Sequence, residues 1–462
     1  MIVMKFGGTS VMDAAAIDRV FRIVQGRAAR RPVVVVSAMS KVTDSLLAMS
    51  RAAGEGRRDE ALAISAQLRQ RHLDTAAALL GSGEDEALAA GIQTEFDALD
   101  ELLRGISAVG ELTARTNDSV LGYGERLSSK LCAAAFRQRG LDAALVDARQ
   151  VMITDRGFGK AIPQIEAIDQ AAQKVLKPLL EAGKIPVLGG FVGATAEGTP
   201  TTIGRGGSDF SAALLGAALD AETIEIWTDV DGMKTTDPRL CPEARRIKVI
   251  SFEEAAELAY FGAKVLHPAT VLPAVRKDIP VRVLNSMNPA NEGTLIVGQA
   301  PAARNTFIAI AAKKRITIVD VVAARMLGEH GFLKTIFDIF DRHHAAVDVV
   351  STSEVSVSLT VDSNDAIPAL AADLEQIADV KYEGRKAIVC LVGRNIRETP
   401  GIAAQVFTAV RDINVRMISQ GASEINITFV VEEDDVPECI RRLHQTFFSD
   451  TDPSVFDQGE FV

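Results

Sequence analysis

The chain has 462 residues, of which 47% are hydrophobic and 24% are charged, and its formal net charge is -11 at pH 7. This length favours two or three domains. The negative charge argues against a nucleic-acid backbone or an anionic membrane as the main partner and leaves a local basic pocket open. No apolar run approaches the roughly 20 residues that span a bilayer. The four cysteines show no metal-ligand spacing and the N-terminus shows no signal-peptide pattern, so we expect free thiols and a cytoplasmic location.

The first predicted element is a strand at residues 1–6, which ends in the run KFGGTS (5–10) before a helix predicted over residues 15–30. Glycines let the backbone approach an anion, a helix N-terminus offers unpaired N–H groups, and Lys5 adds a positive charge. The run is neither a Walker A sequence nor a GxGxxG fingerprint. By itself it indicates either a structural turn or an anion-binding loop.

A second apolar strand is predicted within VVVVSAMS (33–40), and residues 54–115, rich in Ala, Leu and acids, predict a helical insert without a motif that carries chemistry. The stretch LGYGERLSSKL (121–131) offers Glu125 beside a Gly-x-Gly. Leu127 stands where a dinucleotide fingerprint needs glycine, which excludes a Rossmann interpretation of this stretch.

Further apolar strands are predicted at residues 185–191, 222–229 and 279–285, with helical patterns over 204–219 and 252–266 between them. Strands that are apolar along their whole length and alternate with helices are typical of a parallel sheet covered on both faces. The first part of the chain is therefore predicted to be a three-layer α/β domain.

The second glycine-rich run, TIGRGGSDF (202–210), also follows a strand and opens a helix. Arg205 can bind a carboxylate or a phosphate through its forked guanidinium. Ser208 and Asp209 stand at the helix start, where the alternative interpretation is a plain helix cap. Two such loops in one parallel sheet favour a phosphate or carboxylate site at the C-terminal ends of the strands.

Two later motifs carry polar residues next to apolar elements. In WTDVDGMKTTDPR (227–239) a buried strand runs into a polar turn; Asp-Gly alone is turn chemistry, but the acidic and basic residues also suit a nucleotide with its metal. In FGAKVLHP (261–268), Lys264 either reaches solvent or points into a site. The polar residues of the first motif are Thr228, Asp229, Lys234 and Arg239.

After a linker predicted at residues 299–305, the chain contains an internal repeat, because residues 331–362 align without a gap on residues 401–432. Each copy predicts a strand, a helix that starts at a glycine, a second strand, a hairpin turn and an alternating strand, which indicates two copies of one small α+β module. The repeat resembles the ACT domain, a regulatory module that pairs edge to edge and holds small effectors, usually amino acids. A surplus strand at 306–313 is a candidate to complete the sheet of the second copy.

In this order, KFGGTSV, GRGGSD, WTDV with TDPR, and FGAKVLHPAT, followed by the two ACT-like copies, resemble the aspartokinases of the amino-acid-kinase superfamily over essentially the whole chain. The resemblance implies a kinase domain at 1–298 and two ferredoxin-like ACT domains at 299–384 and 385–462, without a fused homoserine dehydrogenase. It also implies transfer of phosphate from ATP, with Mg²⁺, to the β-carboxylate of L-aspartate. That reaction opens the biosynthesis of lysine, threonine and methionine.

The resemblance further implies roles for the candidate site residues. Lys5 and Asp209 are expected to be catalytic, Arg205 to hold the α-carboxylate of aspartate, and Glu125 to hold its α-ammonium. A carboxylate with a pKa of about 4 is already a nucleophile at neutral pH, so no general base is expected. The other expected substrate-binding residues are Gly7, Gly8, Thr9, Ser37, Thr43 and Ser208. The expected nucleotide-binding residues are Lys5, Thr228, Asp229, Lys234, Arg239 and Lys264. Mg²⁺ is expected to bind mainly through ATP, and Lys234 stands where relatives often have tyrosine.

The first ACT-like copy offers carbonyl and acidic groups that suit an amino acid with a second cation. Its phrase TSEVSVS is similar to lysine-sensitive aspartokinases, which implies feedback inhibition by L-lysine, with threonine as runner-up, in a homodimer or a dimer of dimers joined by the ACT domains. The second copy has Ile418 in place of Asp348 and is expected to be a packing partner. The expected effector-binding residues are Met326, Phe332, Leu333, Val347, Asp348, Thr352, Ser353 and Glu354.

Two alternatives from different classes stay open on the sequence. One is another amino-acid kinase, acting on glutamate, N-acetylglutamate or UMP, although such relatives generally lack a tandem ACT tail. The other is a catalytically silent amino-acid sensor, against which the presence of Lys5, Arg205, Asp209 and Asp229 argues.

Overall fold

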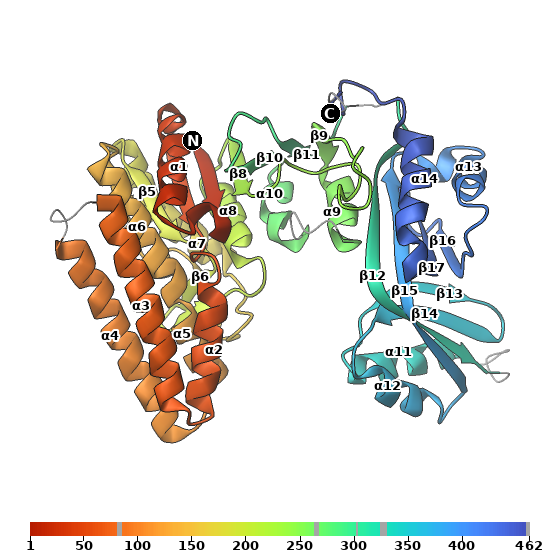
Figure 1. Ribbon diagram of the computed structural model, residues 1–462, viewed down its shortest axis with the longest axis horizontal. Coiled ribbons are helices and arrows are strands. Elements are labelled where there is room, and N and C mark those ends of the chain that lie inside the picture. The colour runs from red at the N-terminus through yellow and green to blue at the C-terminus, as the bar shows by residue number, and fades with distance from the viewer. Residues whose placement is uncertain (81–85, 263–267, 302–303, 324–329, 459–462) are drawn as a thin grey trace. The chain divides into compact units, whose positions relative to one another are not determined.

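The computed structural model describes residues 1–80, 86–262, 268–301, 304–323 and 330–458 (Figure 1). Every helix among these residues is too short or too polar to cross a bilayer. The chain forms two compact units. The first contains Met1–Met233 with Val265–Ala300, and the second contains Lys234–Lys264 with Pro301–Val462.

The first unit is an α/β domain built on a mostly parallel sheet. Its strands are β1 (Ile2–Phe6), β2 (Pro32–Val36), β3 (Ala143–Leu145), β4 (Ile153–Thr154), β5 (Ile185–Gly189), β6 (Val192–Thr195), β7 (Pro200–Thr202), β8 (Thr223–Thr228), β10 (Val281–Asn285) and β11 (Thr294–Val297). Its helices are α1 (Ala14–Gln25), α2 (Val42–Gly54), α3 (Arg58–Leu80), α4 (Glu86–Val109), α5 (Ala114–Leu121), α6 (Tyr123–Gln138), α7 (Ile165–Glu181), α8 (Gly207–Ala218) and α10 (Leu272–Arg276), with 3₁₀ turns η1 (Gly8–Val11), η2 (Ala28–Arg30), η3 (Ala148–Gln150) and η4 (Pro268–Val271).

The main sheet of this unit has the strand order β3-β5-β2-β1-β8-β10-β11, with β11 antiparallel to β10. The central strands β1 and β2 are buried along their whole length, as their continuous apolar sequences predict. Helix α6 packs with α1, whereas α7 packs with α8 (Figure 1). The predicted three-layer α/β architecture is therefore confirmed.

The predicted helical insert is confirmed as well, since α3 and α4 pack on each other and on α2. Two predicted helices end earlier than expected. The helix over 15–30 stops at Gln25, because Gly26 closes it and a 3₁₀ turn follows. The helix over 252–266 stops at Tyr260, and two residues later Gly262 has a positive φ of +125.

The second unit is an α+β assembly. Its strands are β9 (Val249–Ser251), β12 (Phe307–Val322), β13 (Val347–Thr352), β14 (Ser356–Asp362), β15 (Asp379–Gly393), β16 (Met417–Gln420) and β17 (Asn426–Glu432). Its helices are α9 (Phe252–Tyr260), α11 (Phe332–Arg342), α12 (Ile367–Leu374), α13 (Ile402–Ala409) and α14 (Val436–Phe448), with 3₁₀ turns η6 (Ile396–Glu398) and η7 (Glu433–Asp435).

The internal repeat is visible in this unit. Helices α11 and α13 both begin after a left-handed glycine, Gly331 at φ +88 and Gly401 at φ +77. The strands of the two copies, without β9, form one antiparallel sheet in the order β13-β14-β12-β15-β17-β16. The segment Phe307–Lys313 of β12 pairs with Ile388–Gly393 of β15, which also pairs with β17. The long strands β12 and β15 thus join the two modules into one continuous sheet.

Candidate active site

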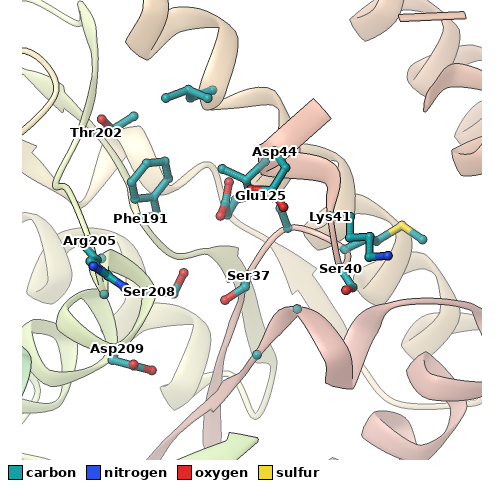
Figure 2. A pocket seen from close by; sticks show the side chains of 18 of the residues that line it. Ser37, Ser40, Lys41, Asp44, Glu125, Phe191, Thr202, Arg205, Ser208 and Asp209 are labelled. Carbon is teal, nitrogen blue, oxygen red and sulfur yellow. The ribbon is translucent and has the colours of Figure 1, made fainter. Parts of the chain in front are cut away.

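A pocket with a volume of about 740 Å³ opens at the C-terminal ends of β1, β2 and β8 in the first unit. Figure 2 shows Glu125 and Ser37 between Arg205, Ser208 and Asp209 on one side and Ser40 and Lys41 on the other. Twelve residues predicted from the sequence line it: Lys5, Gly7, Gly8, Thr9, Ser37, Thr43, Glu125, Arg205, Ser208, Asp209, Thr228 and Asp229. Motifs that lie more than 200 residues apart in the chain therefore meet in one place.

Lys5 gives the pocket a buried positive charge. It lies on the central strand β1 and is only 8% exposed. Its Nζ lies 2.7 Å from Oδ1 of Asp209, in the first turn of α8, and forms an ion pair without hydrogen-bond geometry. A desolvated ammonium interacts more strongly with an incoming anion than one in water, because the local dielectric is low.

The KFGGTS run is both a turn and a wall of the pocket. The Gly7 amide donates to the carbonyl of Trp227, and the Ser40 amide donates to the carbonyl of Gly8, each at 3.0 Å. A Cβ at Gly8 would lie 2.9 Å from the Ala38 carbonyl oxygen. Glycine is required there because the loop after β1 touches the backbone of the loop after β2.

Arg205 lies between two left-handed glycines just before α8. The helix is capped by Gly206 at φ +74 without a side-chain cap, so the helix-cap interpretation of Ser208 and Asp209 is wrong. Both of these side chains line the pocket. The Arg205 side chain is exposed, and within the described part of the chain it forms no ion pair. Its guanidinium is available to a ligand carboxylate or phosphate.

Glu125 is the most deeply buried acid of the pocket. It lies in the first turn of α6, is 4% exposed, and its buried Oε2 has no hydrogen-bond partner among the described residues. Burial raises the pKa of its carboxyl to about 7, against the opposing effects of the Ala38 amide and the Lys5 charge. Such a carboxylate is suited to bind a cation that enters the pocket.

Several lining residues were not predicted, among them Lys41, Asn117, Gly159, Phe191 and Thr202. Two of them are held by Asp118, a fully buried carboxylate on α5. It accepts hydrogen bonds from the Gly159 amide (2.9 Å) and from the amide (3.0 Å) and hydroxyl (2.7 Å) of Thr202. The local sequence gave no signal for these contacts, because they join α5 to segments that are 41 and 84 residues away in the chain.

Among the described residues, two of the predicted nucleotide-binding residues, Lys234 and Arg239, do not line this pocket. Lys234 and Arg239 belong to the second unit, and Arg239 is 86% exposed and paired with Asp237 at 2.6 Å. Lys264 lies outside the described residues. Their role stays a prediction.

The described residues contain no cluster of three or more His, Cys, Asp or Glu side chains that could hold a metal ion. The pocket nevertheless presents carboxylates, among them Asp209 and Asp229. Mg²⁺ is commonly bound by one or two carboxylates together with substrate phosphates and water. The donor set therefore fits a metal that arrives with a nucleotide.

Of the predicted effector residues, Asp348 has the most informative surroundings. Its side chain is 2% exposed, Lys313 Nζ lies 2.8 Å from its Oδ2, and the Tyr260 hydroxyl donates to its Oδ1 at 2.9 Å. Phe332 and Leu333 begin α11, Val347 and Thr352 lie on β13, and Ser353 and Glu354 follow in the turn to β14, whereas Met326 lies outside the described residues. The Asp348 carboxylate thus already binds one primary ammonium.

Comparison with known proteins gives matches over nearly the whole chain. Residues 1–285 match the amino acid kinase family, and residues 319–372 and 389–447 match the ACT domain. Lysine-sensitive aspartokinase 3 of Escherichia coli is 37% identical over 97% of this chain and 99% of its own length. Two crystal structures of E. coli aspartokinase III cover 97% of this chain and 100% of theirs at 37% identity. The complex with aspartate and ADP (R-state) has a TM-score of 0.82, and the complex with lysine and aspartate (T-state) has a TM-score of 0.83.

Proposed function

This chain belongs to the aspartokinase family and is an aspartate kinase of aspartate-family amino-acid biosynthesis, and from that premise we propose that the pocket described above is its active site. There ATP phosphorylates the β-carboxylate of L-aspartate to 4-phospho-L-aspartate, in the cytoplasm. The observation that carries the proposal is the meeting of Lys5, Glu125, Arg205 and Asp209 on one pocket.

The chemistry follows from the charges. The β-carboxylate of aspartate is ionised at neutral pH and needs no base, but it must approach the anionic γ-phosphate. Catalysis is then a matter of position and positive charge. Lys5, held at 2.7 Å from Asp209, supplies a fixed ammonium between the two anions. Asp209 and Asp229, which both line the pocket, would hold a Mg²⁺ ion that arrives with ATP, and the ion would supply positive charge to the phosphates.

The two charged groups on the α-carbon of the substrate are recognised by side chains of opposite charge. Arg205 binds the α-carboxylate and Glu125 the α-ammonium, while Ser37, Thr43 and Ser208 bind polar atoms. The backbone at Gly7, Gly8 and Thr9 faces the transferring phosphate, and Thr228 and Asp229 face the nucleotide. In-line transfer needs this order of groups along one pocket.

The experiment that tests the proposal is a coupled ADP-release assay with ATP, Mg²⁺ and either L-aspartate or L-glutamate. ADP release that depends on L-aspartate is expected. Equal or faster release with L-glutamate would contradict the proposed substrate, and no release with either would contradict catalysis at this pocket.

The raised pKa of Glu125 gives a pH prediction. Only the ionised carboxylate binds the α-ammonium, so with a pKa of about 7 in the free enzyme the KM for aspartate is expected to fall about tenfold between pH 6 and pH 8. Glu125→Gln should raise this KM and flatten its pH dependence, while the KM for ATP keeps the wild-type profile. A pH-dependent aspartate KM that persists in Glu125→Gln would contradict the role.

The same shift has a defined sign for stability. The folded pKa of Glu125 lies above the ordinary value of 4.5, so the fold favours the protonated carboxyl. This contribution is complete below pH 4.5 and is lost as the pH rises toward 7. In the absence of aspartate, the Tm of the wild type should therefore fall over this pH range, whereas the Tm of Glu125→Gln should lack this fall. Added aspartate should offset the fall in the wild type.

We also propose that L-lysine inhibits the enzyme at the first ACT module, in a homodimer or dimer of dimers joined by the ACT modules, with threonine as the second candidate. The relative crystallised with lysine supports this, as does the environment of Asp348, whose carboxylate already binds the ammonium of Lys313. A free L-lysine carries the same ammonium group and can compete for this carboxylate. Inhibition requires that lysine bind one conformational state more tightly than the other.

Asp348→Asn should raise the lysine concentration for half-inhibition about tenfold or more, because the buried charge that binds the ammonium is lost. The uninhibited kcat should not change. Kinase assays with L-lysine, L-threonine and L-methionine measure both quantities, with Asp434→Asn as the control, since Asp434 pairs with Arg385 on the surface. A wild-type enzyme insensitive to millimolar lysine would contradict the proposal.

A further inference from the structure

The helical insert contributes one side chain to the loops of the pocket. Arg71, on α3, donates from Nη1 to the carbonyl of Ser40 at 2.9 Å and from Nη2 to the carbonyl of Met12 at 3.0 Å. One guanidinium thus bridges two backbone segments that are far apart in the sequence. The planar fork of arginine suits this bridge, because its two terminal nitrogens point in fixed directions.

Both segments belong to the walls of the pocket. Met12 directly follows the 3₁₀ turn Gly8–Val11, which begins three residues after Lys5, and Ser40 lies in the loop after β2. The two segments also touch directly, through the hydrogen bond from the Ser40 amide to the Gly8 carbonyl. Arg71 therefore links the loop that follows β1, the strand of the catalytic lysine, to the loop that carries Ser37.

The loop after β2 also has a backbone conformation that needs support. Lys41, a pocket residue, has φ +66, in the left-handed region that non-glycine residues rarely adopt. Such a conformation persists only where the surroundings hold it. The Arg71 bond to the carbonyl of Ser40, the residue just before Lys41, is one of the contacts that hold it.

We propose that Arg71 is a positioning residue for phosphoryl transfer: it fixes the loop at Gly8–Met12 and the loop at Ser37–Lys41 in the geometry that the reaction needs. It acts through these loops and does not itself line the pocket. This assigns a function to the helical insert, which the sequence left without one. The proposal rests on the proposed aspartate kinase activity for its kinetic test.

The experiment compares Arg71→Ala with Arg69→Ala in the full-length enzyme. Arg69 lies on the same helix but pairs with Asp97 and Asp100, each at 2.8 Å, and so ties α3 to α4 without reaching either loop. Arg71→Ala is expected to lower kcat about 10- to 100-fold, because small displacements of reacting groups are costly in rate. Arg69→Ala should lower Tm and keep kcat within about twofold of the wild type.

Two further measurements separate positioning from folding. Guanidinium added at millimolar concentration should restore part of the kcat of Arg71→Ala and none in Arg69→Ala. Arg71→Lys, which keeps the charge but lacks the fork, should have an intermediate kcat and serves if Arg71→Ala does not fold. A wild-type kcat in folded Arg71→Ala, or equal loss of kcat and Tm in both alanine variants, would overturn the proposal. An inactive wild type would instead contradict the proposed function.

Discussion

Replacing Lys5 with alanine is expected to lower kcat about 10³-fold, because it removes the fixed positive charge that lets one anion approach another. The Lys5 ammonium is buried and lies 2.7 Å from Asp209 Oδ1. Water that fills the space of the missing side chain is a poor substitute, because its dipoles must reorient in every turnover. The measurement is kcat in the coupled ADP assay with saturating ATP and aspartate.

The fold should survive this substitution. Asp209, which loses its partner, has a side chain that is 17% exposed and keeps contact with solvent. A circular-dichroism melt checks this. Lys277→Ala is the matched control, because Lys277 pairs with Asp220 at 2.6 Å on the surface of the same unit. Near-normal kcat in folded Lys5→Ala would remove the catalytic assignment.

Replacing Arg205 with alanine is expected to raise the KM for aspartate about 100-fold, since the substrate α-carboxylate would enter the pocket without a paired cation. The kcat should change far less, because Arg205 contacts an end of the substrate that takes no part in the transfer. Initial rates over a range of aspartate concentrations at saturating ATP separate the two parameters.

Arg205→Lys should restore only part of the affinity, because an ammonium cannot bind both carboxylate oxygens as the guanidinium fork does. Arg156→Ala is the control, since Arg156 is an exposed arginine of the same unit that pairs with Glu197 at 3.3 Å. An unchanged aspartate KM in Arg205→Ala would contradict the proposed contact with the α-carboxylate. A large loss of kcat at an unchanged KM would instead indicate that Arg205 contacts the transferring phosphate.

Much of the fold and the pocket could be predicted because the signals are local. The apolar run before Lys5 specifies a strand buried on both faces, and the glycines around Arg205 specify a turn before a helix. Parallel strands bring their C-terminal ends to one edge of a sheet, so such loops meet there. The repeat was visible for the same reason, because each ACT-like copy carries its own glycine, helix and alternating strand.

The rest depends on contacts between distant segments. Arg71 looks like any surface arginine of a helix until α3 is packed against α1 and α2, and only then does it reach Ser40 and Met12. Asp348 was predicted to bind an effector, but its partner Lys313 lies on β12, outside the sequence neighbourhood of Asp348. Such pairings form only through tertiary packing, so a local sequence pattern does not predict them.

The identity of the product tests the proposed reaction most directly. Hydroxylamine added during turnover converts an acyl phosphate to a hydroxamate, which mass spectrometry identifies, while the coupled assay counts ADP. With ATP, Mg²⁺ and L-aspartate, we expect one β-aspartyl hydroxamate for each ADP released, and about 10³-fold slower formation of both in Lys5→Ala. ADP release without the β-aspartyl hydroxamate would contradict phosphorylation of the β-carboxylate at this pocket.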